Sequence, residues 1–283
     1  MIDETIEEIQ EMRTHSSSVV AVKATRALGA LTDREFATTE EYLRSLERNS
    51  KALRRANRSH ASLQNAQREV IERVENGDPE RIAEAKELTD EAIAAVTERI
   101  TTAKRRAARN GAAMLEDGTT ILTHDYSSTV LGAIEHATGG GTTIEVYVTE
   151  ARPRYLGRKT ARTLSAVGGV DVTMLTDSAC GHYLPDCDRV LVGMDCIVDD
   201  TLYNRIGTYP TVATAADLGV PVSVIGAGTK IIEEGFVFEN EFRSPSEVMR
   251  EPAEGFAIEN PAYDATPTRL LDSVVTDEET IRY

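Results

Sequence analysis

The chain has 283 residues, of which 41% are hydrophobic and 28% charged, and its formal net charge is −16. This composition excludes a disordered or membrane class, and the negative charge argues against direct contact with nucleic acid, whose phosphates require a basic surface. The acidic amino terminus does not resemble a signal peptide, and no apolar run approaches the roughly 20 residues that cross a bilayer, so we expect a cytoplasmic protein.

Residues 1–112 are predicted to form a helical domain. Apolar residues recur there at helical spacing between acidic and basic ones, and prolines and β-branched runs are almost absent. The hydroxyl cluster at 15–18 is expected to cap the second helix, and the Asn-Gly-Asp-Pro turn at 76–79 to separate the last two. The expected helices cover 2–13, a segment after 18 that reaches 30, 38–56, 63–76 and 79–110.

Residues 113–283 are predicted to form a Rossmann-like domain of the α/β class, with a doubly wound, mainly parallel sheet that binds a ligand. Short β-branched runs recur there with a helix-sized interval after each, the pattern of a parallel sheet covered on both faces. The expected strands are 120–123, 143–149, 171–176, 189–194 and 221–225. Helices are expected over 127–137, 158–167 and 208–218.

The ends of these strands carry the candidate site, because ligands of such sheets bind beyond the carboxyl ends of the strands. The first strand is followed by His124, Asp125 and Ser127 at the start of a helix, where amides and a hydroxyl can bind an anion. A plain capped helix start is the alternative there. The second strand ends at Arg152, whose planar fork suits a phosphate, unless it is a surface arginine paired with Glu150.

The fourth strand delivers Asp195 after an apolar run, with Asn204 and Arg205 a short distance beyond. A carboxylate at the end of a central strand is partly desolvated, which makes Asp195 a candidate acid or base. The alternative is an aspartate that only holds the loop of Asn204. Asp199 and Asp200 could suggest a magnesium site, but the acidic surplus of the whole chain explains them, and no metal is predicted.

No cofactor is predicted either, since the chain lacks a dinucleotide or P-loop fingerprint, and Gly226, Gly228 and Lys230 are too weak a set. Three irregularly spaced cysteines fit neither a disulfide framework nor a zinc site. Lysine is scarce beside plentiful Asp, Glu and Arg, which indicates a salt-loving source. An ordinary acidic cytosolic protein is the alternative.

Four segments in order together resemble one known family: GTTILTHDYS at 118–127, VTEARP at 148–153, GMDCIVDDTLYNRIGTY at 193–209 and NPAYDATP at 260–267. They are similar to signature blocks of the family that unites archaeal ribose-1,5-bisphosphate isomerase, methylthioribose-1-phosphate isomerase and the alpha, beta and delta regulatory subunits of initiation factor 2B. The resemblance spans nearly the whole chain. It implies a sugar-phosphate pocket at the strand ends and homo-oligomers built through the carboxyl-terminal domain.

Position 125 departs from the isomerases of that family. The resemblance implies a reactive cysteine there, working with an aspartate that Asp195 matches. An aspartate is ordinarily ionised at neutral pH and cannot donate a proton, although two carboxylates that face one site raise one of their pKa values. The segment 15–17, His-Ser-Ser, stands where the isomerases have an Arg-Gly-Ala phosphate grip, and Arg205 stands in place of a lysine.

These departures favour a regulatory protein of the initiation factor 2B type that binds a phosphorylated sugar or nucleotide, with initiation factor 2 as a candidate partner. The alternative function is a sugar-phosphate aldose–ketose isomerase. In that case Asp195 and Asp125 share the proton transfers, and Arg152, Asn204 and Arg205 hold the substrate.

Overall fold

The structure is a computed structural model that describes all residues except 1, 12–15, 233–236 and 252–253. The chain forms two compact units, Met1–Ala103 and Lys104–Tyr283. The division lies before the boundary expected at 112, inside helix α5 (Ile82–Ala112). The last turns of this helix belong to the second unit because Ala107 is part of the core beneath its sheet.

The first unit is helical, as predicted. Its helices have an apolar core, in which the Tyr42 hydroxyl lies 2.8 Å from Thr89 Oγ1. Thr38 caps α3 by accepting from the amide of Glu41, whereas Ser16 makes no side-chain capping bond to α2, and His15 lies outside the described residues. The elements besides α5 are α1 (Ile2–Gln10), α2 (Ser17–Ala27), a 3-10 turn (Leu28–Leu31), α3 (Thr39–Ala56) and α4 (Ala61–Asn76).

Although α5 is 31 residues long, its exposed faces are polar. Across the described ranges, no helix combines the length and apolar character that a membrane crossing requires.

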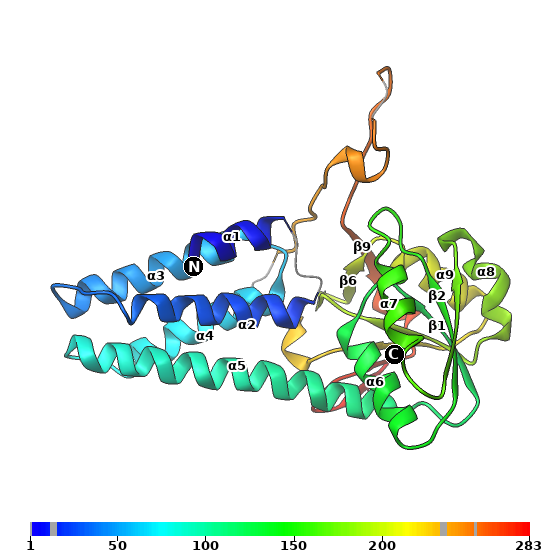
Figure 1. Cartoon of the computed structure of the whole chain (residues 1–283), viewed down its shortest axis with the longest axis horizontal. Helices are drawn as coiled ribbons and strands as arrows, with labels where there is room; N and C mark the ends of the chain where they lie inside the picture. Colours follow the sequence, from blue (N-terminus) through cyan, green and yellow to red (C-terminus); the bar gives the residue numbers. More distant parts are fainter. Residues whose placement is uncertain (1, 12–15, 233–236, 252–253) are drawn as a thin grey trace. The chain divides into compact units, whose positions relative to one another are not determined.

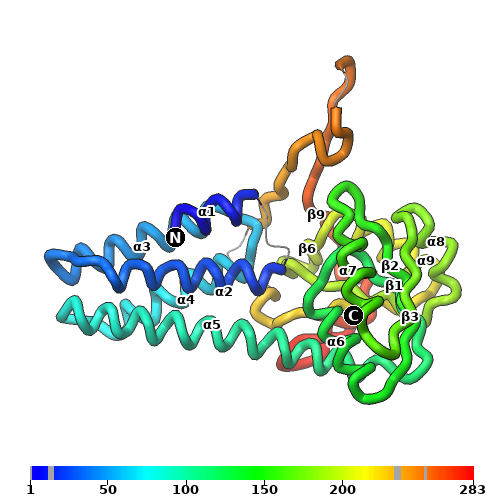
Figure 2. Tube along the Cα trace, in the orientation of Figure 1, coloured from blue at the N-terminus to red at the C-terminus, as the bar shows by residue number. Residues whose placement is uncertain are grey.

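The second unit is built on a seven-stranded sheet with the order β11-β10-β7-β4-β1-β2-β3. Figure 1 labels its strands β1 and β2, and Figure 2 also labels β3. Every pairing is parallel except that of β10 with β11, so the prediction of a mainly parallel, Rossmann-like sheet is confirmed. The strands are β1 (Thr119–His124), β2 (Ile144–Thr149), β3 (Val170–Leu175), β4 (Arg189–Gly193), β7 (Val222–Ile225), β10 (Ser273–Val275) and β11 (Thr280–Arg282).

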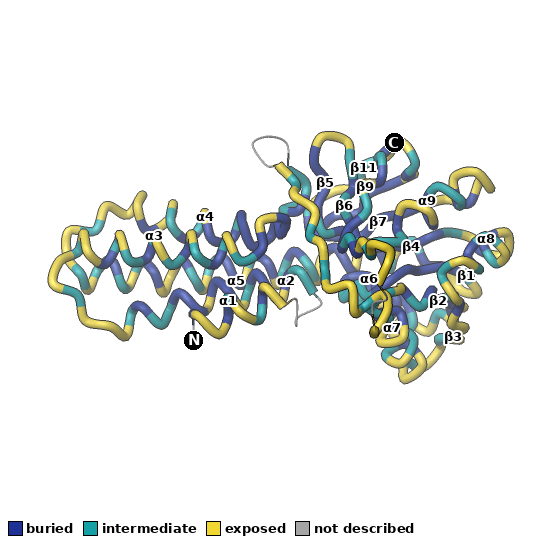
Figure 3. The backbone as a smooth tube through the Cα atoms, turned by 90° about the horizontal axis from the view of Figure 1, so that it is seen from above, coloured by how far each residue is buried: buried dark blue, intermediate teal, exposed yellow. Residues whose placement is uncertain are grey.

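Helices cover both faces of this sheet, which leaves its central strands dark blue in Figure 3. Successive side chains of a strand point to opposite faces, so Ile121 joins the core under α6 (Ser128–Gly139) and α7 (Leu156–Leu164). Its neighbour Leu122 joins the core under α9 (Thr208–Asp217) and the short α8 (Cys180–Tyr183). Burial on both faces explains the unbroken apolar runs of these strands.

A second sheet, of four strands in the order β8-β5-β6-β9, was not predicted. Its strands are short or lie far apart in the chain, so they carry little local periodicity. Asp199 and Asp200, both exposed and with positive φ, form the two-residue turn of the β5–β6 hairpin. The strands are β5 (Cys196–Val198), β6 (Thr201–Arg205), β8 (Ile231–Ile232) and β9 (Tyr263–Pro267).

Candidate active site

The candidate site lies where the order of strands in the large sheet reverses. Strands β1 and β4 are neighbours, and the chain leaves them in opposite directions, towards β2 on one side and β7 on the other. Open α/β sheets bind ligands at such a switch point. Asp125 follows β1 and Asp195 follows β4, so the two candidate catalytic carboxylates extend from the two strands that border it.

Asp125 is held in an enclosed position. Asp125 is 5% exposed, and its backbone is left-handed, with a φ of 63°. Its carbonyl oxygen accepts a hydrogen bond of 2.7 Å from Thr160 Oγ1. Burial raises the pKa of the Asp125 carboxyl, an effect that Arg205 and His124 oppose and that Asp195 reinforces. The carboxyl therefore favours its protonated form more than an exposed aspartate does.

Arg205, the last residue of β6, joins the two carboxylates. Its Nε lies 3.4 Å from Asp195 Oδ2 and 3.8 Å from Asp125 Oδ2. Burial alone would lower the pKa of Arg205, but Tyr263, Asp195 and Asp125 raise it overall, so the guanidinium stays charged. Its carbon Cζ also lies 4.8 Å from the centre of the Tyr263 ring.

His124 and Ser127 serve the fold around the site. The His124 ring places Nδ1 2.6 Å from Thr149 Oγ1 and Nε2 2.8 Å from the carbonyl oxygen of Ile206. Since that carbonyl can only accept, Nε2 carries the proton. The Ser127 hydroxyl caps α6 by accepting from the amide of Val130, which was the alternative considered for this helix start. Ligand contacts of His124 and Ser127 remain predictions.

Asn204 and Arg152 occupy different surroundings. Asn204 is 7% exposed and donates to Thr208 Oγ1 at the start of α9. Arg152 is exposed, and its Nη2 donates 3.1 Å to the carbonyl of Val248. Glu150 pairs with Arg158 at 2.9 Å, which removes the alternative pairing considered for Arg152. Their substrate-holding roles remain predictions.

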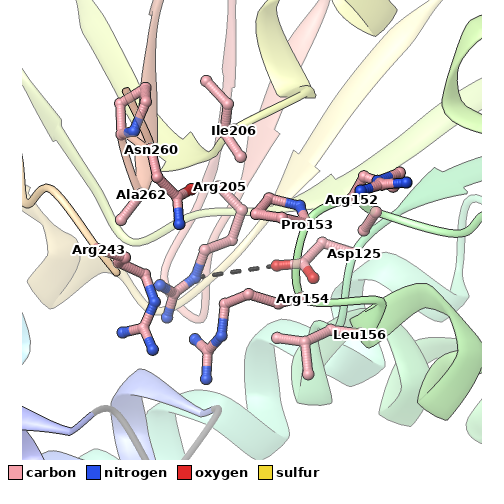
Figure 4. Close-up of a pocket in the computed structure, with 12 residues that line it drawn as sticks. Asp125, Arg152, Pro153, Arg154, Leu156, Arg205, Ile206, Arg243, Asn260 and Ala262 are labelled. Carbon is pink, nitrogen blue, oxygen red and sulfur yellow. Dashed lines mark ion pairs between the residues drawn. The ribbon is translucent and has the colours of Figure 1, made fainter. Parts of the chain in front are cut away.

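A pocket of the second unit contains Asp125 and Arg205 in its wall (Figure 4). Asp195 does not itself line this pocket, and its carboxylate touches the Arg205 of the wall. Two further arginines, Arg154 and Arg243, line it and were not identified from the sequence. The remaining lining residues are Ala151, Arg152, Pro153, Leu156, Ile206, Asn260, Pro261 and Ala262.

Lys230 is a further buried charge near Asp195 that sequence reasoning set aside. It is 5% exposed, and its Nζ donates 2.7 Å to the carbonyl oxygen of Met194. Burial lowers its pKa, and Asp195 opposes that effect. The sequence feature that could have identified Lys230 is the Gly-Ala-Gly-Thr-Lys run. This run follows the central strand β7, as Asp195 follows the central strand β4.

Cys196 and Cys187 are poor substitutes for the thiol that the resemblance implies at position 125. Cys196 follows Asp195 directly, but burial, together with Asp195, raises the pKa of its thiol to about 12. Burial likewise raises the pKa of Cys187 to about 12. Both thiols stay protonated at neutral pH and are poor nucleophiles.

The described residues contain no group of three or more His, Cys, Asp or Glu side chains arranged to hold a metal ion. The charged side chains that the structure places around the site include those of Asp125, Asp195, Lys230 and the arginines of the pocket.

Comparisons of the sequence identify a family. A sequence profile described as "Initiation factor 2 subunit family" matches residues 13–281. A ribose 1,5-bisphosphate isomerase of Haloterrigena turkmenica is 33% identical over 96% of this chain and 88% of its own length. One from Haloferax volcanii is 32% identical over 96% of this chain and 86% of its own.

Solved structures share the fold. A translation initiation factor eIF-2B from Pyrococcus horikoshii OT3 matches with a TM-score of 0.85 and 24% identity, over 99% of this chain and 96% of that one. A 5-methylthioribose 1-phosphate isomerase from the same organism matches with a TM-score of 0.83 and 24% identity, over 99% and 84%.

Proposed function

The chain belongs to the initiation factor 2 subunit family, and within it we propose a cytoplasmic aldose–ketose isomerase that acts on a ribose bisphosphate. The observation that carries the proposal is the pair of carboxylates, Asp125 and Asp195, that share Arg205 at the switch point of the sheet. Relatives named ribose 1,5-bisphosphate isomerase, at 32% and 33% identity over almost the whole chain, support it. The sequence alone favoured a regulatory protein and gave the isomerase as the alternative. The proposal reverses that preference.

The reaction moves hydrogen within one sugar. The bond from carbon 1 to the ring oxygen breaks, the ring oxygen gains a proton, carbon 2 loses its hydrogen, its hydroxyl becomes a carbonyl, and carbon 1 gains a hydrogen. Such a conversion needs an acid for the leaving ring oxygen and a base for the protons that carbon 2 and its hydroxyl give up.

Asp125 suits the role of the acid. Burial raises the pKa of its carboxyl, so a carboxylic acid can do the work of the cysteine that the family's isomerases are expected to use. Asp195, in contact with Arg205, suits the role of the base. The Arg205 guanidinium can stabilise negative charge that develops on the oxygen of carbon 2.

The test supplies ribose 1,5-bisphosphate to the purified chain and measures formation of the ketose. We expect turnover that falls roughly 10²- to 10⁴-fold in Asp195→Asn, the usual contribution of a positioned acid or base. Asp199→Asn is the matched control, since Asp199 lies in an exposed turn where asparagine also tolerates a positive φ. Absence of turnover in the unchanged chain would reject the proposal.

A regulatory protein of the initiation factor 2B type is the second candidate, and the observation that favours it is the aspartate at position 125. A regulatory protein would bind its ligand without converting it and would associate stably with initiation factor 2. Binding of ribose 1,5-bisphosphate without turnover, together with co-purification of initiation factor 2, would support this candidate over the isomerase.

We also propose that copies of the chain assemble through the second unit. The family resemblance carries this expectation, and light scattering of the purified chain tests it. A monomer at micromolar concentration would reject it.

A further inference from the structure

Three arginines of the pocket gather on one side of it, although they come from three separate segments. Arg154 follows β2, Arg205 ends β6, and Arg243 belongs to the segment between β8 and β9. Figure 4 shows their side chains extending to the same side, while Arg152 points away from them. Like charges brought together at a partly buried site repel one another, so such a cluster is typical of a site that receives an anion.

The carboxylates around this cluster are already shared among the arginines. Arg205 contacts Asp125 and Asp195. Arg243 is held by Glu247, whose two carboxylate oxygens accept bonds of 2.6 to 3.1 Å. Glu241 also faces the group, and burial raises its pKa, which favours its neutral form.

The other two arginines of the cluster act on the charge of Arg154. Burial lowers the pKa of Arg154, Arg243 and then Arg205 lower it further, and Glu247 and Asp125 oppose them with smaller effects. A bound anion between Arg154 and Arg243 would reverse this balance and stabilise both guanidinium groups.

Glu247 organises the Arg243 side of the pocket. Besides holding the guanidinium, it accepts 3.1 Å from Nδ2 of Asn260, which also donates 3.0 Å to the carbonyl of Ser244. The amide of Arg243 donates 2.8 Å to the carbonyl oxygen of Asn260. The Arg243 fork is therefore oriented before any ligand arrives, and a preorganised fork loses less entropy on binding.

We propose that Arg154 and Arg243 bind the phosphate on carbon 5 of the ribose bisphosphate, with Glu247 as the positioning residue for Arg243. The inference rests on the proposed isomerase function, because the reacting carbons 1 and 2 then lie at Asp125 and Arg205. The phosphate at the far end of the sugar reaches the other arginines of the same pocket. Two guanidinium forks match the charge and the oxygens of a phosphate monoester dianion.

The test measures binding instead of turnover. In an Asp195→Asn chain, where conversion is slow, calorimetry gives the affinities for ribose 1,5-bisphosphate and for ribose 1-phosphate, which lacks the second phosphate. We expect the bisphosphate to bind more tightly, and Arg154→Met or Arg243→Met to reduce this preference roughly 10- to 100-fold, as removal of a charged hydrogen-bonding partner does. Arg162→Met, an exposed arginine of α7, is the matched control and should keep the preference.

The preference, a ratio of two affinities, separates the subsite from a general loss of structure, which would weaken both ligands alike. Glu247→Gln should reduce the preference less than Arg243→Met, since the Arg243 guanidinium remains but is no longer oriented. The inference is overturned if the Asp195→Asn chain without further changes binds the two sugars equally. It is also overturned if both arginine variants keep the full preference for the bisphosphate. A lost preference in Arg162→Met also overturns it. A preference that depends on Arg154 and Arg243 in a chain without isomerase turnover upholds the subsite and rejects the isomerase function.

Discussion

Asp125 and Asp195 share a single cation: the Nε atom of Arg205 lies 3.8 Å from one carboxylate and 3.4 Å from the other. Two carboxylates that face one site disfavour each other's ionised form, and Asp195 accordingly adds to the rise in the pKa of Asp125. Burial raises the pKa of the Asp125 carboxyl, and Arg205 and His124 oppose that rise. The proposed roles, Asp125 as the acid and Asp195 as the base, agree with this direction.

Replacement of Asp125 tests this division of roles. We expect Asp125→Asn to lower kcat roughly 10²- to 10⁴-fold, because an amide cannot donate the proton that a catalytic acid supplies. Asp125→Cys should retain more activity and move the alkaline limb of the pH–rate profile upward, since a thiol has an ordinary pKa of about 8.5. Profiles of kcat/KM against pH for the three proteins check this. Identical alkaline limbs for the Asp and Cys forms would show that residue 125 is not the acid.

Stability should also depend on the protonation of Asp125. Its folded-state pKa is raised above the unfolded value of about 3.9, so the folded chain keeps a proton that the unfolded chain releases. The stabilisation from this retained proton is fully present below about pH 4 and is lost as the pH rises through the pKa of Asp125 in the folded chain. Asparagine does not ionise, so we expect Asp125→Asn to gain stability relative to the unchanged chain as the pH rises above the unfolded value of about 4.

Chemical denaturation at a series of pH values measures this difference. Asp199→Asn provides the comparison, because Asp199 lies in an exposed hairpin turn and its replacement should leave the pH dependence unchanged. A stability difference between Asp125→Asn and the unchanged chain that is constant from pH 4 to 8 would contradict the protonated state.

Gly207 should be intolerant of a side chain. Its φ is 99°, and a Cβ atom there would lie 2.5 Å from the imidazole ring of His124. We expect Gly207→Ala to destabilise the chain by about 2–4 kcal/mol, through left-handed strain and overpacking together. Gly139→Ala, where a Cβ atom meets open space, should change stability by less than about 1 kcal/mol. Thermal unfolding of both variants measures the contrast, and equal effects would argue against the tight packing around His124.

Salt should stabilise the chain. A net charge of −16 repels itself at low ionic strength, and the screening length falls from about 10 Å at 0.1 M to about 3 Å at 1 M salt. We expect Tm to rise as KCl increases from 0.1 to 2 M. Sucrose at matched osmolarity, which does not screen charge, is the control. A flat or falling Tm in KCl would remove the argument for adaptation to salt.

Local patterns were sufficient for five of the seven strands of the large sheet, and β10 and β11 were not predicted. Five of its strands were predicted within a residue or two, because burial on both faces imposes apolar, β-branched runs that are visible in the sequence. The position of Asp125 and Asp195 beyond two of these strands follows from the same pattern, since parallel strands present their carboxyl ends at one edge. The short strands of the second sheet were missed because two to five residues carry too little periodicity.

The sequence by itself determined the fold class, the family and the two carboxylates, all of which depend on local pattern or on residue identity. Tertiary structure decided what those groups can do. The raised pKa of Asp125 comes from burial, and its link to Asp195 comes from Arg205, which lies on β6 of the second sheet. The convergence of Arg154 and Arg243, from segments far apart in the chain, arises only when the folded backbone brings them to one pocket. Charges interact through space, so their effect on a site depends on distances that no local pattern contains.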